Sequence, residues 1–130
     1  MLKLFMVVCL ITATLLVDVS GSARAQTPAG NVTVVTIIDV ISNASIPQNV
    51  DNAVMLLDKL AADAQQAPGV VSFKVLREAA RANHFIIFGV WKDMKSFETY
   101  SASETTRAFR QAFQPRLGGP FDERIYSDLK

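Results

Sequence analysis

The segment NHFIIFGVW, residues 83–91, gathers the residue types of this chain that are best suited to chemistry on an aromatic ring. It holds the only histidine, His84, near its start and the only tryptophan, Trp91, at its end. A histidine can move protons near neutral pH, and an indole N–H can donate a hydrogen bond to an oxygen atom. Gly89 precedes the tryptophan by two positions, and a glycine within a strand often marks the close approach of a ligand.

Side chains alternate along a strand, so this segment has two faces of different character. One face carries Phe85, Ile87, Gly89 and Trp91. Because glycine has no side chain, we expect a gap beside the indole ring. Aromatic residues from the following segments could complete the walls of a pocket for a flat phenolic ring, and they are Phe97, Tyr100, Phe109 and Phe113. Apolar walls with few polar groups are typical of small-molecule pockets.

Each of these residues also has a purely structural interpretation. A tryptophan at a strand end often belongs to the core, with its N–H bonded at the rim. Gly89 could form a simple bulge, and His84 could be a solvated side chain. Phe109 and Phe113 lie four residues apart, which is also the spacing of a core-facing helix stripe. The arginines beside them, Arg107 and Arg110, are expected on a solvated helix face.

The elements that must position these residues follow from apolar periodicity. Alternating residues predict strands at about 32–40, 70–78 and 84–91, and a last strand at about 121–129. Apolar residues at helical spacing predict a helix at about 48–66, which Pro68 and Gly69 end. Asp93 and Ser103 are suitable N-caps for two shorter helices further along the chain.

The order of these elements is β-α-β-β-α-β, which predicts a ferredoxin-like α+β fold. Such a fold has a four-stranded antiparallel sheet with helices on one face. Both faces of the first strand are largely apolar, so the uncovered face of the sheet requires a partner. We expect a homodimer that is formed sheet against sheet, with Val34, Ile38 or their strand neighbours at the interface.

The first 25 residues have the form of a secretory signal. Lys3 is followed by an apolar run from Leu4 to Val17, and small residues end at Ala25. The run is shorter than the ~20 residues that a membrane-spanning helix needs. We therefore expect cleavage after Ala25, a short linker at 26–31 and a domain at 32–130. The mature protein would be exported, either periplasmic or secreted, and would not be held in a membrane.

Composition excludes several classes of function. The chain has 13 basic and 12 acidic residues without a basic stripe, so a nucleic-acid partner is not expected. Neither a glycine-rich phosphate loop nor a cluster of metal-ligating residues is visible. The single cysteine, Cys9, lies within the predicted signal. These features favour a small apolar ligand or a second copy of the chain as the partner.

Three stretches together give the mature chain a resemblance to a known family. They are APGVVSFKVLRE, NHFIIFGVWKDMKSFETY and SETTRAFRQAFQPRLGGPFDERIY, in this order. The chain resembles the antibiotic biosynthesis monooxygenase family of dimeric α+β barrels, and in particular an exported subgroup similar to quinol monooxygenases. The resemblance implies a reaction of O2 with a small quinol or polyphenol that needs no flavin, haem or metal.

The resemblance also suggests roles for individual residues. Trp91, His84 and Tyr100 are the candidates for catalysis. The candidates for substrate binding are Phe85, Ile87, Gly89, Phe97, Phe109 and Phe113. Many relatives carry Glu at position 89 and His at position 100, and some characterised monooxygenases of the family carry Asn at position 87 and Tyr at position 97. Several polar groups of the family are therefore replaced here.

These replacements leave open whether the chain is an enzyme. The alternative is an exported dimer that binds an aromatic small molecule without converting it. Haem degradation, which related dimeric barrels perform, needs an axial ligand in the second helix, and SFETYSAS contains no histidine.

Overall fold

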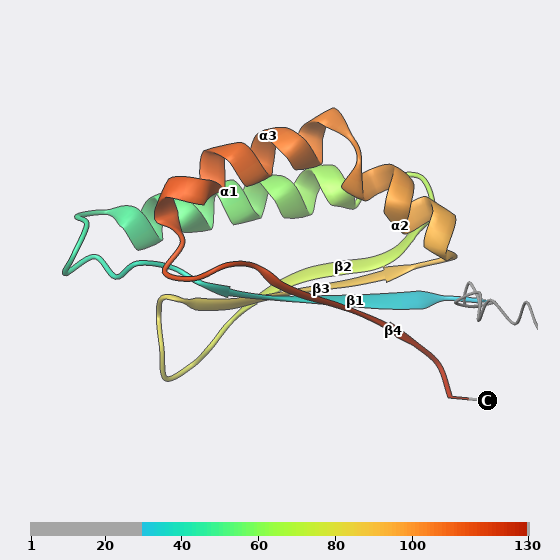
Figure 1. Cartoon of the computed structure of the whole chain (residues 1–130), viewed down its shortest axis with the longest axis horizontal. Coiled ribbons are helices and arrows are strands. Elements are labelled where there is room, and N and C mark those ends of the chain that lie inside the picture. The colour runs from blue at the N-terminus through green and yellow to red at the C-terminus, as the bar shows by residue number, and fades with distance from the viewer. Residues whose placement is uncertain (1–29, 130) are drawn as a thin grey trace, which may run out of the picture.

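The computed structural model describes residues 30–129, in which one sheet is covered by helices on one face (Figure 1). The strands are β1 (Val32–Asp39), β2 (Val70–Arg77), β3 (His84–Trp91) and β4 (Asp122–Ser127). The helices are α1 (Asn49–Ala64), α2 (Met94–Ser101), α3 (Glu104–Phe113) and the short 3-10 helix η1 (Gln114–Arg116). The strand order β2-β3-β1-β4, with antiparallel pairing throughout, confirms the predicted ferredoxin-like fold.

The helices begin and end where local sequence signals place them. The side chain of Asp93 accepts a hydrogen bond from the Ser96 N–H at 2.7 Å, and the Ser103 hydroxyl accepts one from the Thr106 N–H at 3.2 Å. Both bonds satisfy a donor that the first turn of a helix leaves free, so the two predicted N-caps are confirmed. After α1, Gly69 adopts a φ of 81°, a conformation that glycine accepts without strain.

Strand β1, one of the two inner strands, directs alternate side chains to opposite faces of the sheet. Val32, Val34, Thr36 and Ile38 are buried against the helices. Of the residues predicted for a dimer interface, Val34 and Ile38 therefore face the helices, and only their strand neighbours remain as candidates. Their strand neighbours Val35 and Ile37 point the other way, because side chains alternate along an extended chain.

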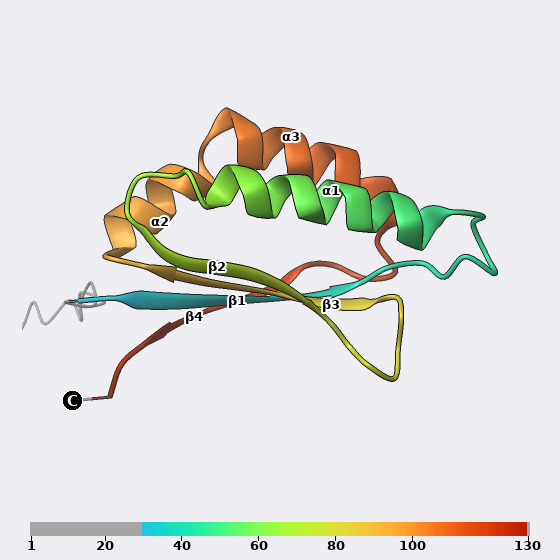
Figure 2. The same cartoon turned by 180° about the vertical axis from the view of Figure 1, so that it is seen from behind.

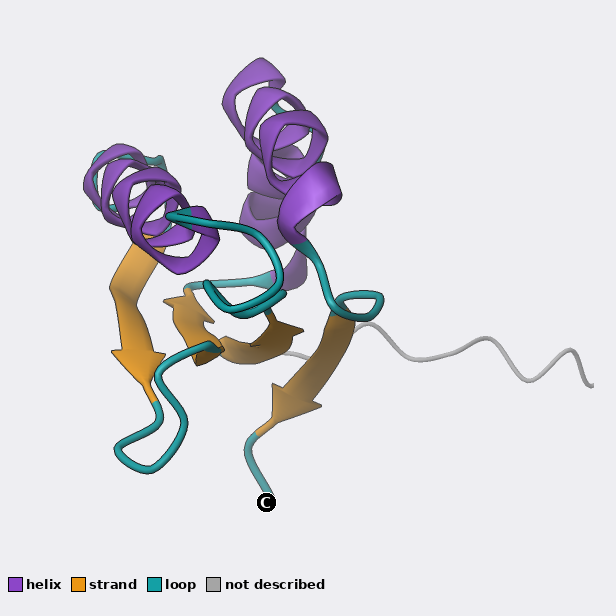
Figure 3. Ribbon diagram, turned by 90° about the vertical axis from the view of Figure 1, so that its left-hand side faces the viewer, coloured by secondary structure: helices purple, strands orange, loops and turns teal. Residues whose placement is uncertain are grey.

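The molecule has two layers, with helices over one face of the sheet and nothing from residues 30–129 over the other (Figures 2 and 3). Pairing in β1 and β3 sets Val35 opposite Phe88 and Ile37 opposite Ile86 on the open face. An apolar face of this kind is typical of a surface that a partner covers, so the homodimer stays a prediction.

The predicted signal, its cleavage site and the linker lie almost wholly outside the described residues. Among residues 30–129, no helix is long and apolar enough to span a membrane.

Candidate active site

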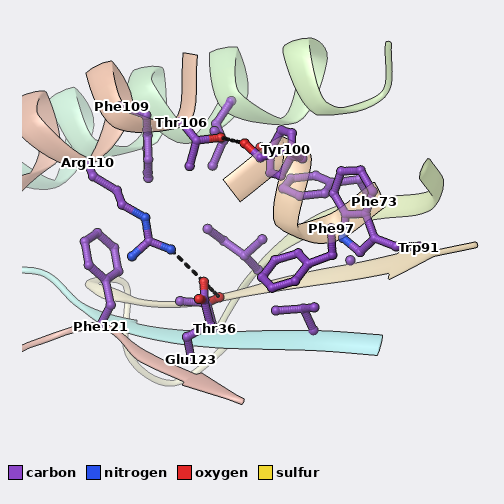
Figure 4. Close-up of a pocket in the computed structure, with 14 residues that line it drawn as sticks. Thr36, Phe73, Trp91, Phe97, Tyr100, Thr106, Phe109, Arg110, Phe121 and Glu123 are labelled. Carbon is purple, nitrogen blue, oxygen red and sulfur yellow. Dashed lines mark hydrogen bonds and ion pairs between the residues drawn. The ribbon is translucent and has the colours of Figure 1, made fainter. Parts of the chain in front are cut away.

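A narrow cavity lies between the sheet and the helices, and side chains from β1, β2, β3, β4 and all three α-helices line it (Figure 4). Its volume is about 40 Å³. That is room for about three water molecules, so a whole aromatic ring can enter only if lining side chains move. The cavity has two ends of different chemistry, which we call the inner end and the outer end.

The inner end is formed by Trp91, Gly89, Phe73, Phe97 and Tyr100. Trp91 is fully buried, and its Nε1–H has no hydrogen-bond acceptor within the described part of the chain. The absent side chain of Gly89 makes room there: a Cβ at this position would lie 3.0 Å from Trp91 Nε1 and 3.3 Å from a ring carbon of Phe73. The glycine and the indole N–H thus border the same small space.

Tyr100 packs beside the indole, with the two ring centroids 4.6 Å apart. Its hydroxyl is a second buried polar group that lacks a hydrogen-bond partner among residues 30–129. Burial raises the pKa of Tyr100 from 10.0 to about 12. The tyrosine is therefore neutral at physiological pH and can donate a hydrogen bond, but it cannot serve as a base.

Unpaired buried donors are rare, because each one loses its hydrogen bonds to water without replacement. Such a loss costs about 1–3 kcal/mol for each group. Two of them on one aromatic cavity indicate a place where an oxygen atom of a ligand would restore the missing bonds.

The outer end is polar and partly exposed. Arg110 of α3 donates a hydrogen bond to Glu123 Oε2 of β4 at 2.7 Å, and Thr36 of β1 donates one to the same oxygen at 3.3 Å. The guanidinium group also lies over the ring of Phe121, 5.2 Å from its centroid. The side chains of Arg110 and Glu123 are 38% and 29% exposed, so this ion pair stands where the cavity meets solvent.

Six of the nine residues proposed from sequence line this cavity. They are Trp91, Tyr100, Ile87, Gly89, Phe97 and Phe109. The strand alternation that placed Ile87, Gly89 and Trp91 on one face agrees with the structure, and this face looks toward the helices.

His84 lies away from the cavity, contrary to its proposed catalytic role. It opens β3 on the uncovered face of the sheet, where its Nδ1 contacts the carboxylate of Asp39. Its Nε2 lies 3.8 Å from a carboxylate oxygen of Glu78. The reason is again alternation, because His84 is an odd number of residues from Trp91 and so points to the opposite face.

Phe85 and Phe113 are also outside the cavity, although both are buried. Phe85 faces the helices at the far end of β3, where Arg77 lies over its ring at 5.2 Å. Phe113 packs behind Phe109 and Phe121, with ring centroids 5.0 and 5.9 Å away. Its role is therefore to support the cavity wall, and of the Phe109 and Phe113 pair only Phe109 reaches the cavity.

Most of the outer end was not predicted from the sequence. Arg110 was expected on a solvated helix face, and Thr36, Phe121 and Glu123 were not among the predicted site residues. A signal did exist, because alternation along the last strand sets Glu123 on the same face as Phe121. No pattern within a single strand or helix indicated that this face meets Arg110 and Thr36.

Within residues 30–129, no three His, Cys, Asp or Glu side chains come close enough together to hold a metal ion.

Fold and site together define a class of protein: a ferredoxin-like α+β domain with an aromatic cavity beneath its helices. The chain belongs to the antibiotic biosynthesis monooxygenase family, whose model matches residues 46–112. No curated protein matches the chain.

Solved structures share the fold at low sequence identity. One is an antibiotic biosynthesis monooxygenase at 13% identity and a TM-score of 0.68, over 76% of this chain and 99% of that one. Another is Rv0793 from Mycobacterium tuberculosis, at 15% identity and a TM-score of 0.68, over 77% and 96%. SnoaB from Streptomyces nogalater, a cofactor-independent oxygenase, has 19% identity and a TM-score of 0.65, over 77% and 94%.

Proposed function

We propose that this chain is a cofactor-independent monooxygenase that oxidises a small quinol or polyphenol with O2. The observation that carries the proposal is the pair of unpaired donors, Trp91 N–H and Tyr100 O–H, on a buried aromatic cavity. Family membership and the likeness to SnoaB, a cofactor-independent oxygenase, support the same reaction class.

The chemistry rests on the substrate itself. A hydroquinone and O2 give a hydroxyquinone and water: one oxygen atom enters the ring, the other leaves as water, and the quinol supplies all four electrons. The phenolate form of the ring is the electron-rich species that reduces O2. The protein must therefore bind the ring, help its hydroxyl lose a proton and keep bulk water away.

The inner end is suited to hold one oxygen atom of such a ring. The indole and phenol donors of Trp91 and Tyr100 stabilise negative charge on an oxygen atom in a buried environment, where a hydrogen bond to a charged acceptor is strong. The aromatic side chains around them would stack on the ring or meet its edge.

Oxygen uptake tests the proposal directly. The purified protein, treated with a chelator, should consume O2 with hydroquinones or naphthoquinols faster than the buffer alone, and label from isotopic O2 should appear in the product. The inner-end variant Trp91→Phe should slow this uptake, whereas Met55→Gln, a change at a surface position away from the cavity, should leave it unchanged. If oxygen uptake with every quinol is no faster than autoxidation, the proposed monooxygenase activity is refuted.

A non-catalytic aromatic-binding protein is the second candidate, and one observation favours it. Neither His84 nor Tyr100, the two titratable candidates for catalysis, can act as a base in this cavity, because His84 faces away and Tyr100 stays protonated. Quenching of the Trp91 fluorescence by a quinol, without any oxygen uptake, would establish this candidate instead.

We further propose a homodimer in which the open faces of two sheets meet. The support is the apolar set on this face, which includes Val35, Ile37, Ile86 and Phe88. Phe88→Lys should convert a dimer to a monomer in light scattering, because the charge would have to be buried at the interface. A monomeric unaltered protein at micromolar concentration would contradict the proposal.

Export is proposed from the amino-terminal pattern alone. The mature protein should begin at Gln26, and mass spectrometry of protein from its native host would measure this. Soluble protein that keeps Met1 would contradict it.

A further inference from the structure

The proposed reaction needs a group that takes the phenol proton, and the cavity restricts the choice. His84 is on the other face of the sheet, and Tyr100 holds its own proton because burial raises its pKa to about 12. The other ionisable residues that line the cavity are Arg110 and Glu123. Arginine stays protonated in proteins and cannot accept a proton.

We propose that Glu123 is the catalytic proton acceptor of this cavity; this inference rests on the function proposed above. Glu123 comes from β4 at the outer end, across the cavity from Trp91 and Tyr100 (Figure 4). Within residues 30–129, both hydrogen bonds to its carboxylate reach Oε2, from Arg110 at 2.7 Å and from Thr36 at 3.3 Å. The second oxygen, Oε1, keeps its acceptor capacity for a substrate hydroxyl.

The two partners of Oε2 have a positioning role. Thr36 is a buried residue on the inner strand β1, so it gives the carboxylate a rigid support. Arg110 is steadied in turn by the ring of Phe121. Both contacts restrict the rotation of a side chain that would otherwise move freely at the protein surface.

The transfer is balanced in atoms and charge. The O–H bond of the phenol breaks, its proton forms a new bond to Oε1, and the electron pair stays on the phenolate oxygen. Before transfer Arg110 faces a carboxylate, and afterwards it faces a phenolate beside a neutral carboxylic acid. The net charge of the site does not change, so the cavity never holds an unpaired charge.

The position of Glu123 at the mouth of the cavity also allows the carboxylate to be regenerated after each reaction. Its side chain is 29% exposed, so the proton can pass from the carboxylic acid to bulk water. A base at the buried inner end would have no such direct contact with bulk water.

The first test measures a probe and needs no turnover. Bound 4-nitrophenol is titrated with pH by its phenolate absorbance, and its binding is followed separately by Trp91 fluorescence. A carboxylate beside the probe hydroxyl disfavours the phenolate, so Glu123→Gln should lower the pH of half-ionisation of the bound probe by about one unit. The matched control is Asp122→Asn, because Asp122 is the neighbouring acid on β4 and does not line the cavity.

An equal half-ionisation pH in the unaltered protein and in Glu123→Gln would overturn the inference. An equal shift of the half-ionisation pH in Glu123→Gln and in the control Asp122→Asn would also overturn it, since the cause would then be the general negative charge of β4. A probe that fails to quench Trp91 in the unaltered protein would refute the cavity as an aromatic site, and the inference with it.

The second test uses oxygen uptake and separates a base from a positioning residue. Glu123→Gln should lower kcat for a neutral hydroquinone by about 10²- to 10⁴-fold, the usual contribution of a general base. The loss should shrink as the pH rises toward the ionisation of the hydroquinone itself, because an ionised substrate needs no base. Glu123→Asp keeps a carboxylate and should retain a decline of the rate at low pH.

A loss in Glu123→Gln that is the same at every pH would show that Glu123 only positions substrate, and would overturn the inference. The two proposals can also fail separately. A probe shift without oxygen uptake would contradict the monooxygenase and support the proton acceptor. Oxygen uptake that Glu123→Gln leaves unchanged would support the monooxygenase and contradict the proton acceptor.

Discussion

The two ends of the cavity have opposite physical characters. The inner end is buried, and its polar groups, Trp91 Nε1 and Tyr100 OH, have no hydrogen-bond partner among the described residues. The outer end is partly exposed, and its polar groups, Arg110 and Glu123, pair with each other. A ligand oxygen could therefore supply the missing hydrogen bonds at the inner end. At the outer end the hydrogen bonds already exist, and they can be exchanged for bonds to water or a ligand at little cost.

The largest contrast between the two ends should appear in stability. Trp91→Ala should lower the free energy of unfolding by about 3–5 kcal/mol, because it leaves a hole in a fully buried wall. Glu123→Ala should change it by less than about 1 kcal/mol, since it removes a partly exposed ion pair. Urea unfolding followed by circular dichroism measures both. Similar losses at the two positions would contradict the division into a buried and a partly exposed end.

A side-chain carbon added at position 89 should force its neighbours to shift. It would lie 3.0 Å from Trp91 Nε1 and 3.3 Å from a ring carbon of Phe73, which is tighter than most such contacts. Gly89→Ala should therefore destabilise the protein by about 1–3 kcal/mol in thermal unfolding. The matched control is Gly119→Ala, where a Cβ would meet no atom within 4 Å. A melting temperature as high in Gly89→Ala as in Gly119→Ala would mean that the wall adapts freely.

Removal of an unpaired donor should separate binding from stability. Tyr100→Phe deletes a hydroxyl that has no partner among residues 30–129, so the folded protein should lose no stability. A bound phenolic ligand should lose one hydrogen bond, worth about 1 kcal/mol, or roughly five-fold in Kd. Titrations followed by Trp91 fluorescence measure the second effect. A clear drop in melting temperature would instead indicate that the Tyr100 hydroxyl has a structural partner.

The smallest effect at neutral pH concerns the ionisation of Tyr100. Because burial raises its pKa to about 12, the phenolate should appear only in strongly alkaline solution. The folded state disfavours the ionised tyrosine, so its contribution to stability is constant below pH 10 and declines as the pH rises from 10 toward 12. Ultraviolet titration of Tyr126→Phe, in which Tyr100 is the only tyrosine, measures this pKa. Ionisation near pH 10 would mean that the hydroxyl is well solvated.

Local patterns in the sequence determined much of the fold and the inner end. The alternation in residues 84–91 put Ile87, Gly89 and Trp91 on one face, and the structure has them on the cavity. The cap residues Asp93 and Ser103 marked two helix starts correctly. Neighbours along a strand or helix are related by a fixed geometry, so such statements need no knowledge of the rest of the chain.

Only the tertiary structure decided which face of each element meets which partner. Alternation along the strand placed His84 and Trp91 on opposite faces of the sheet. Both faces are apolar, however, so the sequence did not tell which face the helices cover. The outer end joins Thr36, Arg110 and Glu123, and Thr36 lies 87 positions before Glu123 in the chain. Contacts over such separations depend on how the layers pack, because no local periodicity relates residues of distant elements. For this reason the sequence revealed the aromatic wall, and the polar residues at the mouth became visible only in the folded chain.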